Sequence, residues 1–140
     1  MVYLTRRYRF SASHRLHSEA LSAEENARIY GKCNNPYGHG HNYTLHVTVG
    51  GPVDPATGMT LDLGVLDRVV NEGVLEPLGH THLNLDVPIF EHLVPTTENL
   101  CREIYNILRE KLAQTAPESP ARLKRVLLEE TNSNYFEYEG

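Results

Sequence analysis

The chain has 140 residues, of which 40% are hydrophobic, and this length suits one domain with a sizeable core. Acidic residues outnumber basic ones, 18 to 13, so the formal net charge is −5. The chain therefore lacks the surplus of basic residues that a nucleic-acid-binding protein uses to neutralise the phosphate backbone.

The distribution of apolar residues excludes two further classes of protein. No apolar run approaches the roughly 18 residues that span a bilayer, and residues 1–7 lack the apolar core of a signal peptide. We therefore expect a cytoplasmic protein, a single domain over residues 1–140, with no nucleic-acid or membrane partner. The two cysteines are too few for a disulfide framework, so free thiols are expected.

Two strands are predicted in the first 50 residues. Hydrophobic and polar residues alternate over residues 2–12 and again over residues 41–50, which is the period of a strand with one buried face. Between them, residues 17–38 lose all periodicity and end in a run of turn-forming residues over 31–38. We expect a loop there that is able to carry functional residues.

Two helices are predicted in the second half of the chain. Asp62 can cap the first, whose apolar residues recur at helical spacing and fade toward Pro77. This helix should stop before the proline. The second helix should begin after Pro95, where Thr96 or Thr97 can serve as the N-cap.

The predicted order of elements indicates the fold class. A hairpin over residues 123–130 and 135–138, around the turn at 132–134, should close the chain after the two helices. The order is then ββααββ, an α+β fold with an antiparallel sheet and two helices on one face. In a chain this short, the exposed face of the sheet is available for burial by copies of the same chain.

Two histidines flank a glycine at the start of the second predicted strand. Because residues two apart in an extended chain point to the same face, His39 and His41 can reach one ion. Antiparallel pairing of the two strands would bring His14 near them, and three imidazoles with an open fourth position are typical of a catalytic zinc site. Separate surface histidines would also account for the motif. His80 and His82 form a competing pair, but in a predicted loop, where holding two ligands costs more entropy.

One of the two cysteines lies close to this motif. Cys33 precedes His39 by six residues, in the predicted loop, and a thiol near a cation can act as a base or nucleophile. The alternative role, a small buried hydrophobic residue, suits Cys101, which falls beside the apolar stripe of the second predicted helix.

These residues resemble a known family. The matching segments are residues 10–16 (FSASHRL), 31–43 (GKCNNPYGHGHNY), 54–59, 83–88, 96–99 and 129–131. They cover nearly the whole chain, and on them the chain is similar to the 6-pyruvoyl-tetrahydropterin synthase and 6-carboxytetrahydropterin synthase family.

The resemblance implies an architecture and an assembly. Members of this family have a tunnelling fold, in which the sheets of ββααββ subunits join in a trimer to form a barrel. Two such trimers stack, and the active sites lie between subunits. We therefore expect a homohexamer built as a dimer of trimers.

The resemblance also implies roles for individual residues. The cofactor implied is Zn²⁺, with the ligands His14, His39 and His41. The catalytic residues implied are Cys33, as the thiolate that abstracts a proton, and His80, as the second proton carrier. The substrate-binding residues implied are Glu130, as the anchor of the pterin, and Thr96, Thr97 and Glu98, as lining of the pterin pocket.

Two of these assignments have alternatives. The pterin edge presents two adjacent donors, its 2-amino group and N3–H, which one carboxylate can accept together. Glu129 offers the same chemistry as Glu130. Helix capping alone would account for residues 96–98.

The reaction implied is that of the family. Triphosphate is lost from 7,8-dihydroneopterin triphosphate, and hydrogens shift within the molecule to give 6-pyruvoyl-tetrahydropterin. No nicotinamide or flavin is needed, and the chain has no glycine-rich dinucleotide motif.

Two other functions stay open at this point. The 6-carboxytetrahydropterin synthases share the fold, substrate and zinc ligands, but have fewer residues between the cysteine and the histidine pair. The interval from Cys33 to His39 therefore favours the pyruvoyl branch. A pterin- or purine-binding paralogue with impaired catalysis is the other alternative, because Gly79 stands where the family has an aspartate before His80. Another acid, such as Asp86, could still reach that histidine.

Overall fold

A five-stranded sheet with the strand order β3-β1-β2-β4-β5 forms the base of the fold in the computed structural model, which describes residues 1–140. The strands are β1 (Val2–His14), β2 (His39–Gly51), β3 (Thr81–His82), β4 (Arg122–Thr131) and β5 (Asn134–Tyr138). Neighbouring strands are antiparallel, except that the short β3 runs parallel to β1. The predicted strands are confirmed, and β3 is an addition that two residues of sequence could not predict.

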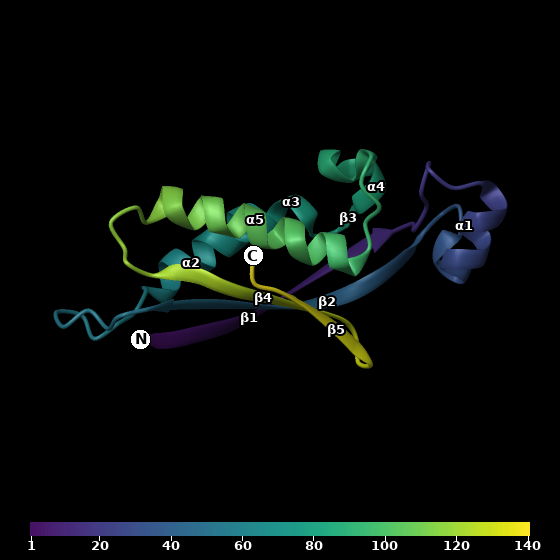
Figure 1. The fold of residues 1–140 in the computed structure, drawn as a ribbon. Helices are drawn as coiled ribbons and strands as arrows, with labels where there is room; N and C mark the ends of the chain where they lie inside the picture. The colour runs from purple at the N-terminus through teal and green to yellow at the C-terminus, as the bar shows by residue number, and fades with distance from the viewer.

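The helices are α1 (Ala23–Tyr30), α2 (Leu63–Val70), α3 (Glu76–Leu78), α4 (Leu83–Asp86) and α5 (Thr97–Thr115), with the turns η1 (Gly31–Asn34), η2 (Asn71–Leu75) and η3 (Pro88–Glu91). Helices α2 to α5 lie on one face of the sheet, and α1 lies beyond the end of the sheet, between β1 and β2 in the chain (Figure 1). The two predicted helices correspond to α2 and α5, which lie on the same face, so the α+β class is confirmed. None of the helices is both long and apolar enough to cross a membrane.

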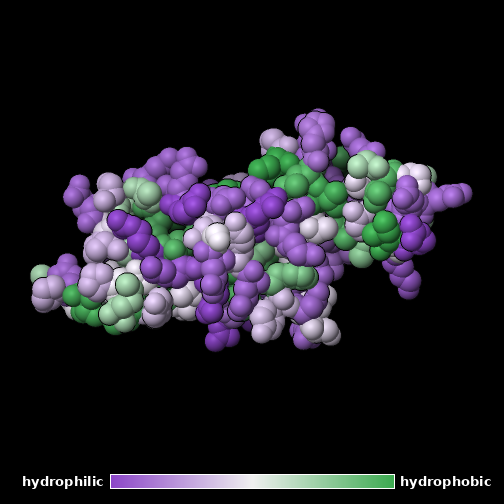
Figure 2. All heavy atoms as spheres, in the orientation of Figure 1, coloured by the Kyte–Doolittle hydropathy of each residue, from purple (hydrophilic) through white to green (hydrophobic).

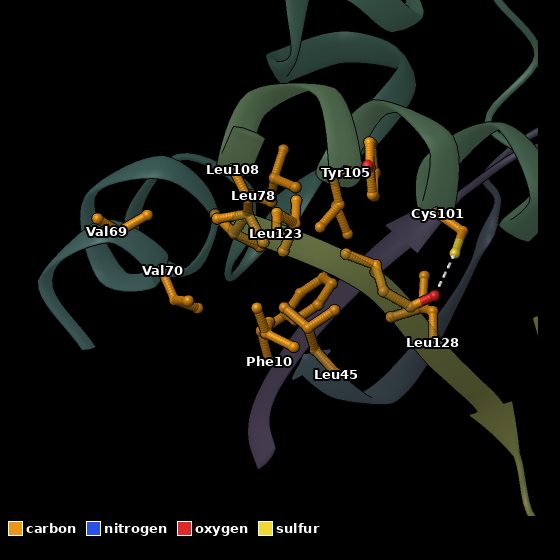
Figure 3. Close-up of a cluster of buried hydrophobic side chains, with 14 of the residues drawn as sticks. Phe10, Leu45, Val69, Val70, Leu78, Cys101, Tyr105, Leu108, Leu123 and Leu128 are labelled. Carbon is orange, nitrogen blue, oxygen red and sulfur yellow. Dashed lines mark hydrogen bonds between the residues drawn. The ribbon is translucent and has the colours of Figure 1, made fainter. Parts of the chain in front are cut away.

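The core lies between the sheet and the helices α2 and α5. Alternate residues of the strands point into it, and Leu45 and Leu128 are 0% exposed. The close-up shows Leu128 of β4 below Cys101 of α5, and Leu45 of β2 beside Phe10 of β1 (Figure 3). Removing one such buried leucine side chain typically costs about 2–5 kcal/mol of stability, so this layer holds the functional end of the sheet in place.

The segment expected to be a loop over residues 17–38 contains a helix, so that prediction was wrong for α1. A capping box begins this helix: the Ser22 hydroxyl accepts from the backbone of Glu25 at 3.1 Å, and the Glu25 carboxylate accepts from the backbone of Ser22 at 3.1 Å. Only Asn26 is buried in α1. The helix therefore has no apolar stripe, and periodicity alone could not reveal it.

The helix expected to stop before Pro77 continues through it, so that prediction was also wrong. The π turn η2 follows α2, and the backbone N–H of Glu76 bonds to the carbonyl of Asn71. Pro77 then falls in the first turn of α3, where its missing N–H removes no helical hydrogen bond. The change of hydrogen-bond register at the π turn thus allows the helix to continue past Pro77.

The molecular surface is mostly hydrophilic, with a few apolar groups. Figure 2 shows hydrophobic side chains gathered over α4 and near the loop after β2. Leu85 and Ile89, in and after α4, are 80% and 47% exposed, and Val53 and Met59 are the exposed apolar residues of the loop. Such patches are typical of surfaces that another chain covers.

Candidate metal centre and its surroundings

Three histidines converge where β1 ends and β2 begins. His14 pairs with His39 in the strand register, and His41 lies two residues further along β2. Their ligand atoms lie within 4.8 Å of one another, and the ring centroids are 4.8 to 4.9 Å apart. The antiparallel pairing expected from the sequence is therefore what brings the three imidazoles together.

The surroundings of His14 prepare it to act as a ligand. Its ring is 1% exposed, and its Nδ1–H donates to the carbonyl of Pro95 at 2.8 Å. Burial lowers the pKa of His14 to about 4, because a charged ring would lose its hydration. The imidazole is therefore neutral at pH 7, with the lone pair of Nε2 directed 3.2 Å from Nε2 of His39.

This arrangement fits a metal ion. A histidine ligand is neutral, and its second nitrogen typically donates to a carbonyl or carboxylate, as His14 does to Pro95. Burial, and next the charge of His41, also lowers the pKa of His39, so its ring favours the neutral form too. The three histidines could therefore hold a metal ion.

Cys33 lies outside the histidine cluster, in the turn η1. Its carbonyl accepts from the backbone of Leu16 at 2.8 Å, and the amide of Asn34 donates to the Leu16 carbonyl at 2.8 Å. The Arg15 guanidinium donates to the Asn34 carbonyl at 3.2 Å. These bonds fasten η1 to the segment directly after His14, and the Cys33 thiol is half-buried there.

The other cysteine has the structural role expected for it. Cys101 is 1% exposed, and burial raises the pKa of its thiol to about 12. Its sulfur lies 3.6 Å from the carbonyl oxygens of Val126 and Phe136. The Cys101 thiol is therefore protonated at neutral pH and closed to solvent.

The acid at the end of β4 faces the histidines. Burial lowers the pKa values of His14 and His39, and the negative charge of Glu130 partly offsets that effect at both rings. The hydroxyl of Thr97 donates to Oε2 of Glu130, and the side-chain amide of Asn134 lies 3.5 Å from Oε1. A carboxylate has about four acceptor sites, so Glu130 can still accept from a ligand.

The neighbouring acid faces the other way. The Glu129 carboxylate accepts from Nε2 of His46 at 3.1 Å, and both residues lie on the face of the sheet without helices. Alternation along β4 separates Glu129 from Glu130. Glu129, the alternative anchor, is therefore directed away from the histidine cluster.

The three residues at the start of α5 have different surroundings. Thr96 is the N-cap, and its hydroxyl accepts from the backbone of Asn99 at 3.2 Å. Thr97 is 2% exposed and bonds to Glu130. Glu98 is exposed in the first turn, where its charge complements the helix dipole. Only Thr97 contacts the candidate anchor.

His80 lines a separate pocket of about 450 Å³, whose Ser11, Ser13 and Asn42 side chains lie on the face of the sheet opposite to the histidine cluster. We name this the donor pocket; its lining residues are Ser11, Ala12, Ser13, Gly40, His41, Asn42, His80, Thr81 and His82. His41 belongs to both sites. The backbone of His80 is left-handed, with φ at 58°, and its N–H donates to the carbonyl of Ser11 at 2.6 Å.

Neither position 79 nor Asp86 supplies a carboxylate to the His80 ring. A Cβ atom at Gly79 would lie 2.4 Å from the carbonyl oxygen of Leu75, so an aspartate has no room there. The Asp86 carboxylate accepts from the backbone N–H of His82 at 2.8 Å. It supports the chain after His80 rather than the His80 ring.

Sequence reasoning missed some of these groups. The Pro95 carbonyl, which orients His14, is a backbone acceptor and leaves no signal in a side-chain pattern. Ser11 and Asn42, which line the donor pocket, belong to strands whose polar positions looked like ordinary solvent-facing residues. Only the regular alternation of β1 and β2, which places Ser11 and Asn42 on one face of the sheet, could have indicated from the sequence that these two residues lie together.

Comparisons with known proteins agree with this geometry. A family model described as 6-pyruvoyl tetrahydropterin synthase matches residues 3–140. The human 6-pyruvoyl tetrahydrobiopterin synthase is 46% identical over 137 residues, which cover 98% of this chain and 90% of that protein. By contrast, the 6-carboxy-5,6,7,8-tetrahydropterin synthase of Aquifex aeolicus is 25% identical over 158 residues, covering 96% of each.

A solved structure supports the same relationship. The 6-pyruvoyl tetrahydropterin synthase of Caenorhabditis elegans superposes with a TM-score of 0.91 at 41% sequence identity, over 99% of this chain and 95% of that one. On the family match, the sequence identities and this superposition, the chain belongs to the 6-pyruvoyl tetrahydropterin synthase family.

Proposed function

We propose that this chain is a zinc-dependent lyase that converts 7,8-dihydroneopterin triphosphate to 6-pyruvoyl-tetrahydropterin and triphosphate. One observation carries the proposal: three imidazoles converge beside a carboxylate that is free to accept from a ligand, in a chain of this family. His14, His39 and His41 would hold the ion, which when bound supplies Lewis-acid activation of the substrate's side-chain hydroxyls.

Glu130 is the proposed anchor of the substrate ring. Its carboxylate accepts from the 2-amino group and N3–H of the pterin, a pair of parallel bonds that sets the orientation of the ring. The Thr97 hydroxyl holds one carboxylate oxygen and keeps Glu130 turned toward the histidine cluster. The substrate side chain is then presented to the metal ligands.

Cys33 and His80 are the proposed proton carriers. The Cys33 thiolate removes a carbon-bound proton; in support, hydrogen bonds join its turn η1 to the segment directly after His14. His80 carries the second proton from the donor pocket, which shares His41 with the metal centre. Hydrogens move only within the substrate and these two groups, so no redox cofactor enters the reaction.

We further propose a homohexamer, as a dimer of trimers. Both edges of the sheet support it: the outer edge of β1 is unpaired over residues 2–10, and β5 is unpaired on its outer side. Open edges are templates for pairing with another chain. The exposed apolar residues Leu85 and Ile89 offer further surface to bury. Light scattering of the purified protein should give six times the mass of the chain.

The cytoplasm is the proposed location. Cys33 and Cys101 are both free in the structure, as expected for a reducing compartment. The pterin substrate is a small molecule, and nothing in the charge balance favours a nucleic-acid partner.

A binding paralogue with impaired catalysis is the second candidate. The observation that favours it is the contact between Gly79 and Leu75, which leaves His80 without a carboxylate beside it. An imidazole that lacks such a partner is less well oriented as a proton carrier.

Product identification separates the candidate functions. The zinc-loaded protein is incubated with 7,8-dihydroneopterin triphosphate, and the products are identified by mass spectrometry. We expect 6-pyruvoyl-tetrahydropterin and triphosphate. A 6-carboxy product would assign the chain to the other branch of the family, and unchanged substrate bound to the protein would make it a paralogue without catalysis.

A further inference from the structure

One hydroxyl beside the metal centre has no hydrogen-bond partner. Tyr43 lies on β2, two residues after His41, and the centroids of the two rings are 5.6 Å apart. Its side chain belongs to the core and is 1% exposed, and its hydroxyl is buried without a partner. Buried hydroxyls are normally hydrogen-bonded, because one without a partner loses its bonds to water and gains none.

Packing does not account for this hydroxyl. The Tyr43 ring stacks on Phe10 of β1, with the ring centroids 5.0 Å apart and the ring planes 19° apart. A phenylalanine would fill the same place. Because the hydroxyl lies on the axis of a ring that the stack holds, it cannot turn to solvent. A hydroxyl that destabilises the ligand-free protein in this way is explained by a partner that becomes available when a ligand binds.

Glu130 is the acceptor placed to become this partner. The pairing of β2 with β4 ends at Thr44 and Glu129, so Tyr43 and Glu130 lie one step further along the two strands, on the face that carries the helices. Residues opposite each other on antiparallel strands have Cβ atoms about 4.5–5.5 Å apart. Burial first, and the negative charge of Glu130 second, raise the pKa of Tyr43, so the charge of the carboxylate reaches the hydroxyl.

The Glu130 carboxylate has room for a second donor from the protein. Its Oε2 accepts from Thr97, while Oε1 has only a long contact of 3.5 Å, to the Asn134 amide. A carboxylate offers about four acceptor sites on its two oxygens. With Thr97 on one oxygen and Tyr43 on the other, each oxygen keeps a site for one of the two parallel donors of a pterin edge.

We propose that Tyr43 is a positioning residue for the substrate, whose hydroxyl donates to Oε1 of Glu130 when the pterin is bound. This inference rests on the proposed function, in which Glu130 anchors the pterin. A rotation of the carboxylate toward the pterin edge exchanges the long contact with Asn134 for the bond from Tyr43. Tyr43 then fixes the second carboxylate oxygen as Thr97 fixes the first, and the ring is held in one orientation beside the metal centre.

The affinity of the zinc-loaded protein for unsubstituted pterin, measured by fluorescence titration, tests the proposal. This probe has no side chain to contact the metal, so it reports on the anchor alone. Tyr43→Phe removes only the hydroxyl and should weaken binding about tenfold, the effect of one hydrogen bond to a charged acceptor. The melting temperature of the ligand-free variant should equal or exceed that of the wild type, because a buried hydroxyl without a partner has been removed.

Tyr8→Phe is the matched control. Tyr8 also packs against the core from the helix-bearing face of the sheet, but its hydroxyl donates to the Asp67 carboxylate at 2.7 Å. The same substitution there should give the opposite result, a lower melting temperature and an unchanged affinity for pterin.

A double-mutant cycle shows whether Tyr43 acts through Glu130. In the Glu130→Gln background, Tyr43→Phe should change the affinity for pterin by no more than about twofold, because the carboxylate that the hydroxyl supports is gone. A loss as large as in the wild-type background would overturn the proposal, since the hydroxyl would then act on the ligand by another route.

Two further results count against the role of Tyr43. Equal pterin affinity in Tyr43→Phe and the wild type would show that the hydroxyl is not used in binding. A lower melting temperature of ligand-free Tyr43→Phe would show that the hydroxyl already has a partner, such as a bound water.

Failure of the proposed function gives a different pattern. A wild type that binds pterin with the expected ranking of variants, but leaves 7,8-dihydroneopterin triphosphate unconverted, would overturn the function and support the role of Tyr43. Conversion of the substrate with unchanged pterin affinity in Tyr43→Phe would overturn the role of Tyr43 alone. A wild type that does not bind pterin would remove the Glu130 anchor and this inference with it.

Discussion

The metal centre depends on how each imidazole is held in place. Pro95 accepts from His14 on the side away from the cluster, while the strand register sets His39 beside it and His41 two residues on. The Pro95 carbonyl and the strand backbone position the ligands, so the loss of one side chain should leave the fold intact. Its effect should therefore be seen in metal content rather than in stability.

His39→Ala should bind far less zinc than the wild type, which should carry about one ion per chain, because two imidazoles hold zinc much more weakly than three. His46→Ala is the matched control, since His46 bonds to Glu129 on the other face of the sheet. Elemental analysis after gel filtration gives the ratio. Full occupancy in His39→Ala would place the metal elsewhere, with His80 and His82 the next residues to replace.

Burial of His14 predicts a dependence of stability on pH in the metal-free protein. The pKa of His14 is lowered from 6.5 to about 4, so between these values the unfolded chain binds a proton that the folded chain does not. The stability from His14 is therefore complete above pH 6.5 and is lost as the pH falls toward 4. The free energy of unfolding should fall by about 2–3 kcal/mol from this group.

Urea titrations of the metal-free wild type and of His14→Gln, at pH 7 and at pH 4.5, measure this effect. His14→Gln should lose less stability on acidification, because glutamine does not titrate. An equal loss in the two proteins would show that His14 is not buried as a neutral ring.

The two acids at the end of β4 should differ in their effect on pterin binding. Glu130→Gln should weaken it about tenfold or more, because an amide cannot accept two parallel bonds and a charge-assisted bond contributes about 1.5–3 kcal/mol. Glu129→Gln should bind normally, since that carboxylate faces His46. Fluorescence titration with a pterin compares them, and equal affinities would remove Glu130 from the anchor role.

At the scale of elements, the segment between α3 and β3 positions His80. Gly79 donates to the Leu75 carbonyl at 3.0 Å, and a Cβ at Gly79 would lie 2.4 Å from that same oxygen. The next residue, His80, is held in a left-handed conformation by its bond to Ser11. The glycine therefore has a packing role that its place in the sequence did not reveal.

Replacement of this glycine should destabilise the protein. Gly79→Ala and Gly79→Asp should each lower the free energy of unfolding by about 1–3 kcal/mol, the usual cost of overpacking. Gly40→Ala is the control, because its Cβ would meet its nearest neighbour, the Ala12 carbonyl oxygen, at 3.8 Å. Denaturant titrations give the three values. A Gly79→Asp variant as stable as the wild type would show that the backbone can move to admit the side chain.

The elements differ in how far the sequence could predict them. Alternation identified β1 and β2 because each has one buried face, and apolar spacing identified α2 and α5 for the same reason. The helix α1 packs through Asn26 alone and was missed. The passage of the chain through Pro77 depends on the π turn, which no local pattern indicates.

At the scale of the whole molecule, the sheet brings the metal ligands and the donor pocket to one end. His14, His39 and His41 come from two strands far apart in sequence, and their pairing could be predicted from the strand pattern. The position of Glu130 beside Thr97 could not, because it depends on where α5 begins above β4. The position of His80 likewise depends on its contacts with Ser11 and the Leu75 turn.

The most direct test of the central claim is the release of triphosphate from 7,8-dihydroneopterin triphosphate by the wild type and by Cys33→Ala, measured side by side. We expect the wild type to release triphosphate and the variant to release none, while zinc content and pterin affinity stay unchanged, because the thiolate acts in the transition state and not as a ligand. Equal rates in the two proteins would contradict the claim that Cys33 removes the proton, and loss of zinc in Cys33→Ala would make the thiol a fourth metal ligand.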